Sequence, residues 1–286
     1  MSSCSDRSPD ALIAASGLPR AEARLLLEQA SGQRREWLLA HGDEALEDAA
    51  CERFLSLKSR RQNGEPIAYL CGEREFHGLA FQVDPAVLIP RPETELLVDE
   101  AARRAPSGAS VLDLGTGSGA IAIALAVTRP DLRLIATDQS VDALALARAN
   151  AHRHQLTEPR VAFRQGSWWQ AIGSSERFAL IVSNPPYIAD RDPHLDQGDL
   201  RFEPHQALAS GIDGLDALRA IIADAPAYLQ PDGWLLLEHG WDQGQAVRAL
   251  LARAGFEAIQ TLRDLADHDR ISIGRRTEND RRPRVV

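Results

Sequence analysis

Lysine is nearly missing from this chain of 286 residues: Lys58 is the only one, and arginine supplies the rest of the 32 basic side chains. The 41 acidic residues outnumber them and give a formal net charge of −9. Affinity for the phosphates of nucleic acids depends on clustered Lys and Arg side chains. The charge balance therefore argues against an extended nucleic-acid-binding surface, and we expect no direct nucleic-acid partner.

Cysteine is also scarce, and long apolar runs are absent. The cysteines Cys4, Cys51 and Cys71 are odd in number and lack the spacing of metal ligands, which predicts reduced thiols and no metal site. The first ten residues, MSSCSDRSPD, are polar, so no signal peptide is expected. Because no run of eighteen apolar residues occurs, we expect no membrane span and a cytoplasmic location.

The chain changes its pattern along its length. Residues 8–72 place apolar side chains at helical spacing, with the longest helix expected over residues 43–64. Residues 73–84 alternate apolar and polar side chains, which predicts a β-hairpin. We therefore expect three parts: a helical domain (1–73), a hairpin linker (74–90) and a larger domain (91–286).

The larger domain alternates strands with helices, after a first helix that Thr94 is expected to cap. The apolar runs typical of strands cover residues 110–115, 132–138, 160–166, 178–184 and 233–240. Such alternation is typical of an α/β fold with a doubly wound, mostly parallel sheet. Residues 257–276 add two strands, of which one can run antiparallel.

A glycine-rich loop, VLDLGTGSGA (111–120), joins the first of these strands to a helix. Gly115, Gly117 and Gly119 let the backbone turn tightly and approach a ligand, because no Cβ stands in the way. Ligands of open α/β sheets bind at the carboxyl ends of the strands. With Ala120 the loop also fits the dinucleotide pattern G-x-G-x-x-A, so the loop alone leaves the ligand open.

Two acidic residues narrow the choice of ligand. Asp138 ends the second strand, where a carboxylate can accept hydrogen bonds from both ribose hydroxyls of an adenosine. This suits NAD and S-adenosylmethionine equally. Asp113 precedes the glycines, and a buried acid there suits a ligand that carries an ammonium group better than one that carries a pyrophosphate. We therefore favour S-adenosylmethionine.

The stretch SNPPYIAD (183–190) follows the fourth strand, which lies beside the first in a doubly wound sheet, so it should face the glycine loop. A planar –NH₂ group is a poor nucleophile because its lone pair is delocalised. The side-chain oxygen of Asn184 and the carbonyl of Pro185 can accept its two N–H groups. Pro186 helps to fix the backbone, and the Tyr187 ring can stack on the planar group. Both bonds strengthen as the nitrogen attacks a methyl group, which stabilises the transition state without a metal.

These motifs together resemble class I S-adenosylmethionine-dependent methyltransferases that act on planar amino groups. Residues 35–43, 65–99 and 229–240 are similar to the peptide chain release factor N5-glutamine methyltransferases, and the resemblance extends over about residues 8–275. It implies a Rossmann-like class I methyltransferase domain behind a helical domain. It also implies methyl transfer from S-adenosylmethionine to the glutamine of the Gly-Gly-Gln motif in class 1 release factors.

The resemblance further implies roles for individual residues. Cofactor contacts are implied for Gly115, Thr116, Gly117, Ser118, Gly119, Asp138, Trp168 and Asn184. Trp169 is an alternative to Trp168, because the loop after the third strand is one residue longer than usual. Substrate contacts are implied for Asn184, Pro185, Pro186 and Tyr187, and catalysis for Asn184, Pro185 and Tyr187. The roles of Arg91, Glu93 and Glu238 stay open.

The helical domain is implied to help hold the release factor, and its mildly acidic character could complement basic patches on that partner. We expect a monomer. The main alternative is a methyltransferase for exocyclic amines of nucleic acids (adenine N6 or guanine N2), which would use the same Asn-Pro-Pro-Tyr chemistry. An NAD-dependent oxidoreductase would need an acid/base pair that the sequence does not offer, and a non-catalytic scaffold would not need this motif.

Overall fold

The computed structural model describes residues 6–277. Cys4 and its neighbours in residues 1–5 lie outside this range, as do residues 278–286. The chain divides into two compact units, of which the first ends at Glu73. Within the described range, no helix is both long enough and apolar enough to cross a bilayer.

The first unit consists of short helices around an apolar core. The helices are α1 (Pro9–Ala14), α2 (Arg20–Ser31), α3 (Arg35–Ala40), α4 (Asp48–Gln62) and α5 (Ile67–Cys71). Leu26, Leu27 and Phe54 are fully buried where α2 packs on α4. The expected helical N-terminal region is therefore confirmed.

The longest helix of this unit begins later than the sequence predicts. Residues 43–47 are not part of α4, which starts at Asp48. Leu46 turns into the core, where it is 7% exposed, and its N–H donates to the carbonyl of Arg7 at 3.1 Å. The predicted start was wrong because this tertiary contact takes up the backbone donor that a helix would use.

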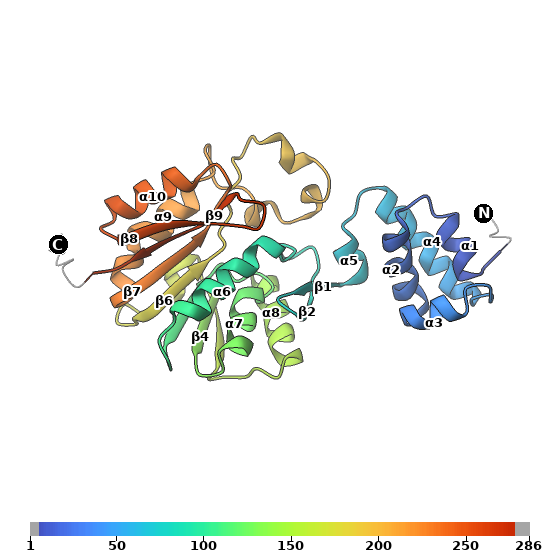
Figure 1. The fold of residues 1–286 in the computed structure, drawn as a ribbon, viewed down its shortest axis with the longest axis horizontal. Helices are drawn as coiled ribbons and strands as arrows, with labels where there is room; N and C mark the ends of the chain where they lie inside the picture. Colours follow the sequence, from blue (N-terminus) through green and yellow to red (C-terminus); the bar gives the residue numbers. More distant parts are fainter. Residues whose placement is uncertain (1–5, 278–286) are drawn as a thin grey trace. The chain divides into compact units, whose positions relative to one another are not determined.

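The second unit is built on a sheet of seven strands (Figure 1). In spatial order they are β5 (Val161–Gln165), β4 (Arg133–Asp138), β3 (Ser110–Leu114), β6 (Phe178–Ser183), β7 (Leu229–Glu238), β9 (Asp269–Arg275) and β8 (Glu257–Arg263). The first five are parallel, and β9 runs antiparallel to β7 and β8. This confirms the doubly wound α/β fold and places the end of β6 beside the end of β3.

Helices cover both faces of the sheet (Figure 1). On one face lie α6 (Glu95–Arg104), α7 (Ala120–Thr128) and α8 (Val141–Arg153), and on the other lie α9 (Asp216–Tyr228) and α10 (Gly244–Arg253). In β3, Val111 packs into the first layer and Leu112 into the second, because successive side chains of a strand point to opposite faces. Burial on both faces explains why the strands read as continuous apolar runs.

The predicted hairpin is present as β1 (Glu73–Phe76) and β2 (Leu79–Gln82). Its turn residues His77 and Gly78 both have positive φ, 52° and 73°. Between residues 6 and 277 there are also five 3₁₀ segments: η1 (Pro92–Thr94), η2 (Trp168–Ala171), η3 (Pro193–Asp196), η4 (Leu200–Phe202) and η5 (His205–Ala207).

Candidate active site

The glycine loop lies between β3 and α7 and is fixed by its own backbone. Gly115, Gly117 and Gly119 have φ values of 74°, 55° and 83°, a region that side chains with a Cβ enter at a cost. The N–H groups of Gly115 and Thr116 both donate to the carbonyl of Thr137 at 2.9 Å. The loop is therefore attached to β4, the strand that carries Asp138.

The loop borders a cavity of about 160 Å³ at the carboxyl edge of the sheet. Of the predicted site residues, its lining includes Gly115, Thr116, Gly117, Ser118, Asp138, Trp168, Asn184 and Pro186. The lining leaves out Gly119, Pro185 and Tyr187. Gly119 caps the N-terminus of α7, and Pro185 is buried. The structure thus gathers most of the predicted residues around one cavity, although they come from distant parts of the sequence.

Asp138 lies at the end of β4 with both carboxylate oxygens in use. Oδ2 accepts the N–H of Gly117 and Oδ1 accepts the N–H of Ser140, each at 2.9 Å. Each carboxylate oxygen can accept a second hydrogen bond. Asp138 therefore orients the loop and keeps capacity for the two hydroxyls of a ribose.

Asp113 is buried beside the loop, as the sequence suggests, but it does not reach the cavity. It is fully buried behind the loop and is not among the residues that line the cavity. Its Oδ2 accepts the hydroxyl of Thr116 at 2.6 Å. Burial raises the pKa of Asp113 to about 7, against the opposing effect of the Thr116 hydrogen bond. A direct contact with a ligand ammonium group is not supported, and Asp113 instead supports the loop from below.

The two adjacent tryptophans point to different places. Trp168 lines the cavity, and its ring lies 3.4 Å from where a Cβ on Gly115 would be. Trp169 stacks on Tyr228, with ring centroids 4.6 Å apart and planes 3° apart, and its Nε1 donates to the carbonyl of Ala220 at 3.3 Å. Trp169 therefore packs against α9, which leaves Trp168 as the candidate for a cofactor contact.

Asn184 directly follows β6 and borders the cavity. Its Nδ2 donates to the Thr94 hydroxyl at 3.1 Å. Its Oδ1 is buried, and no residue between 6 and 277 donates a hydrogen bond to it. A buried carbonyl oxygen without a donor is costly in a folded protein, so this atom is an acceptor with unused hydrogen-bonding capacity at the cavity.

Tyr187 is not among the residues that line the cavity, and its hydroxyl contacts Glu238 at the end of β7. Its hydroxyl donates to Glu238 Oε1 over 3.5 Å, and burial raises the pKa of this phenol. Glu238 is 1% exposed, and burial raises its pKa to about 7, opposed by the nearby Thr94 hydroxyl and by the charge of Arg270. The stacking of Tyr187 on a substrate stays a prediction, because in this structure the hydroxyl contacts Glu238 and Tyr187 is not among the residues that line the cavity.

Sequence reasoning missed a link between Arg91 and the loop that follows η4. The Arg91 guanidinium forms an ion pair with Glu203, whose other oxygen accepts the N–H of Ile89 at 3.1 Å. Glu203 is 6% exposed. The following residues, Pro204, Gln206 and Ala207, line the same cavity as Arg91. The pair therefore holds one wall of the cavity, whereas the neighbouring Glu93 is exposed.

Asn150 is a second residue that the sequence did not single out. Its side chain is fully buried in α8. Nδ2 donates to the carbonyls of Ser118 and Gln82 at 2.9 and 3.0 Å, and Oδ1 accepts the N–H of Gln82 at 2.7 Å. Asn150 therefore ties the glycine loop to the hairpin. The available signal was a polar residue in the apolar stripe of a helix, next to Ala151.

Both parts of the chain are similar to known protein families. Residues 10–72 match the family model described as PrmC N-terminal domain, and residues 92–200 match the one described as Methyltransferase small domain. A release factor glutamine methyltransferase of Xylella fastidiosa (strain Temecula1 / ATCC 700964) is 54% identical over 272 residues, which cover 94% of this chain and 98% of that protein. The one of Escherichia coli (strain K12) is 47% identical over 264 residues, which cover 92% of this chain and 94% of that protein.

Solved structures agree on the fold. A methyltransferase from Pyrococcus furiosus superimposes on this chain with a TM-score of 0.54 at 16% sequence identity. The aligned region covers 78% of this chain and 98% of the Pyrococcus furiosus chain. The relatives from Xylella fastidiosa and Escherichia coli are about half identical to this chain, and each alignment covers nearly the whole of this chain and of the relative. They confirm the resemblance that the motifs indicated: the chain belongs to the family of release factor glutamine methyltransferases.

Proposed function

We propose that this protein transfers a methyl group from S-adenosylmethionine to the side-chain amide nitrogen (N5) of a glutamine. The substrate glutamine lies in the Gly-Gly-Gln motif of class 1 peptide chain release factors. The family supports the substrate, and the geometry around the cavity supports the chemistry. The single observation that carries the chemistry is the buried, unsatisfied Oδ1 of Asn184.

The residues around the cavity fit the cofactor. Asp138 keeps hydrogen-bonding capacity for two ribose hydroxyls. A Cβ on Gly117 would meet nothing within 4 Å, so the backbone is free to approach a ligand there. The Trp168 ring gives the same cavity an apolar wall. When bound, S-adenosylmethionine supplies an electrophilic methyl group on its sulfonium.

Asn184 is proposed to bind the substrate amide nitrogen, which attacks the methyl group. Its Oδ1 accepts one N–H of the substrate amide, and the Pro185 carbonyl accepts the second. Both bonds hold the amide with its nitrogen toward the methyl group. As the N–C bond forms and the S–C bond breaks, the N–H groups become more acidic, so both acceptors bind the transition state better than the ground state. The electron pair of the S–C bond stays on the sulfur of S-adenosylhomocysteine, and one N–H proton then passes to solvent water to restore the neutral amide.

The first unit is proposed to help hold the release factor. Exposed acidic side chains there include Glu36, Asp43, Glu44, Glu47 and Glu52. They can attract basic patches on the partner. Reversal of these charges to lysine should raise KM for the release factor and leave cofactor affinity unchanged. We also propose that the enzyme acts as a monomer, in the cytoplasm, without a direct nucleic-acid partner.

The test is mass spectrometry of a purified release factor after incubation with the protein and S-adenosylmethionine. A matched sample carries Gln→Ala in the Gly-Gly-Gln motif. We expect one added methyl group on this glutamine and none in the control. A protein that binds the cofactor and leaves the release factor unmodified would refute the proposed substrate, and DNA and RNA with free adenine or guanine amines would then be the substrates to try.

A further inference from the structure

Thr94 lies at the end of η1 and is 4% exposed. The sequence predicts it as a helix cap, but it makes no capping bond to α6. Its hydroxyl accepts the Nδ2–H of Asn184 at 3.1 Å and lies near the carboxyl group of Glu238, whose charged form it favours. Thr94 is the N-cap residue of α6, as the sequence predicts, but its side chain makes a contact across ninety residues of sequence in place of a capping bond.

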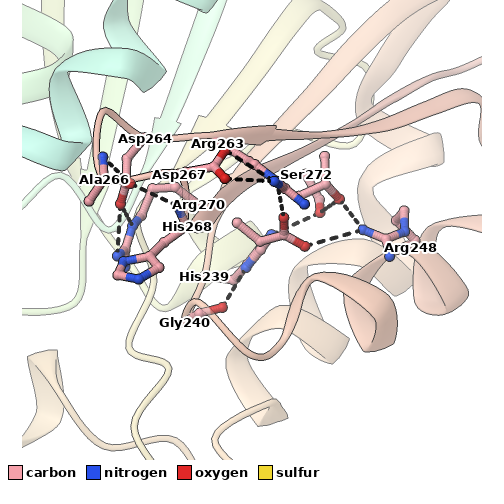
Figure 2. A network of polar contacts seen from close by, with 12 residues as sticks. His239, Gly240, Arg248, Arg263, Asp264, Ala266, Asp267, His268, Arg270 and Ser272 are labelled. Atoms are coloured by element: carbon pink, nitrogen blue, oxygen red, sulfur yellow. Dashed lines mark hydrogen bonds and ion pairs between the residues drawn. The ribbon is translucent and has the colours of Figure 1, made fainter.

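Glu238 lies near both ends of the Asn-Pro-Pro-Tyr motif. Tyr187 donates to its Oε1, and the Thr94 hydroxyl that binds Asn184 lies near its carboxyl group, whose Oε2 has no donor among residues 6–277. The charged groups that face Glu238 are Arg270 and Glu93. Arg270 donates from Nε and Nη2 to Asp264 at 3.2 and 3.1 Å (Figure 2). Its guanidinium is thus bound to Asp264 and acts on Glu238 through its charge.

The strand end that carries Glu238 is itself fixed. The next residue, His239, is fully buried, with Nδ1 2.8 Å from the Gly240 carbonyl and Nε2 2.8 Å from the Ser272 hydroxyl (Figure 2). A ring nitrogen that faces a carbonyl must carry the proton, so the neutral ring accepts the Ser272 hydroxyl at Nε2. These bonds tie β7 to β9 and hold Glu238 in place.

The direction of the hydrogen bonds decides how Asn184 is oriented. The amide nitrogen can only donate, so the Thr94 oxygen accepts from it, and the hydroxyl proton of Thr94 is then available for Glu238. With its nitrogen held by Thr94, Asn184 presents Oδ1 in the other direction, where no described residue donates to it.

We propose that Thr94 is a positioning residue that orients the Asn184 side chain, so that its oxygen and not its nitrogen is presented to the substrate amide. This inference rests on the proposed function. A flipped Asn184 would present two N–H donors to the N–H groups of the substrate, and methyl transfer would lose one of its acceptors. Small errors of placement at a reacting centre can cost about 10²-fold in rate.

The test compares Thr94→Val, which keeps the shape and removes the hydroxyl, with Thr94→Ser, which restores the hydroxyl. We expect Thr94→Val to lower the single-turnover rate of release factor methylation by about 10- to 100-fold. Thr94→Ser should stay close to the wild-type rate. The Kd of S-adenosylhomocysteine should change little in both variants, because Thr94 acts through Asn184.

A double-mutant cycle with Asn184→Ala separates positioning from a general structural effect. In the Asn184→Ala background, Thr94→Val should cause no further loss of rate. An equal loss in both backgrounds, or a Thr94→Val variant as fast as wild type, would overturn the inference. If the wild-type protein itself transfers no methyl group, the proposed function fails instead.

A second measurement does not depend on activity. The side-chain amide signals of Asn184 in a ¹⁵N NMR spectrum can be assigned by their loss in Asn184→Ala. We expect Thr94→Val to move them toward the shifts of a free amide, and Thr94→Ser to leave them near their wild-type positions. Signals that do not move in Thr94→Val would contradict an orienting role for Thr94.

Discussion

Replacement of Gly119 by alanine should destabilise the second unit more than replacement of Gly117 by alanine. A Cβ at Gly119 would lie 2.8 Å from Cδ1 of Ile123 and 3.2 Å from Cβ of Ala147. Both neighbours are fully buried, and the backbone of Ala147 is only 3.4 Å away. An extra methyl group in such a packed site costs about 1–3 kcal/mol. The positive φ of 83° adds about 1 kcal/mol.

Gly117→Ala is the matched control, because φ is 55° there and a Cβ would meet nothing within 4 Å. We expect a loss of about 1 kcal/mol in the free energy of unfolding for Gly117→Ala and about 2–4 kcal/mol for Gly119→Ala. Urea unfolding followed by tryptophan fluorescence reports mainly on the second unit, because Trp37 is the only one of the five tryptophans in the first. Equal losses in the two variants would refute the packing argument for Gly119.

Three further changes test other parts of the site. Asp138→Ala should weaken binding of S-adenosylhomocysteine by about 10- to 100-fold, because hydrogen bonds to a charged group are worth about 1.5–3 kcal/mol. Calorimetry measures this affinity, and an unchanged affinity would exclude the Asp138 carboxylate from the cofactor site. Asn150→Leu should lower the free energy of unfolding by about 2–3 kcal/mol, since the buried Ser118 carbonyl loses its hydrogen-bond donor. Urea unfolding measures this loss, and a variant that unfolds at the same urea concentration as the wild type would contradict the prediction. Asp113 has a pKa raised to about 7 in the folded protein, so the folded state holds its proton more tightly than the unfolded state. The free energy of unfolding of the wild type, relative to that of Asp113→Asn, should therefore fall as pH rises from about 4 to about 7. The fall should be at most about 1.4 kcal/mol per pH unit. A difference between the two proteins that stays constant over this range would disprove the raised pKa.

The features that the sequence predicts well are those with a local pattern. The apolar runs and the glycines between β3 and α7 predict the doubly wound sheet, because strand burial and tight turns need particular residue types at fixed spacing. The order of the strands follows from the rules of such sheets, which is why Asn184 was expected beside the glycine loop before the fold was known.

The features that the sequence does not predict depend on contacts between distant residues. Thr94 bonds to Asn184, ninety positions away, and Asn150 bonds to Gln82, sixty-eight positions away. Neither contact gives a periodic pattern of residue types in the sequence. The choice between Trp168 and Trp169 was open for a similar reason: the two differ in backbone conformation, since Trp168 has a φ of 46°, and this turns their rings in different directions.

Asn184→Ala tests the central claim most directly. The claim is that the unsatisfied Oδ1 of Asn184 accepts an N–H of the glutamine amide in the transition state. We predict that the single-turnover rate of release factor methylation falls by about 10²- to 10³-fold, or about 3–4 kcal/mol, as for the removal of one preorganised hydrogen-bonding group. The Kd of S-adenosylhomocysteine, measured by calorimetry on the same sample, should rise much less. A variant that methylates the release factor at the wild-type rate would contradict the account.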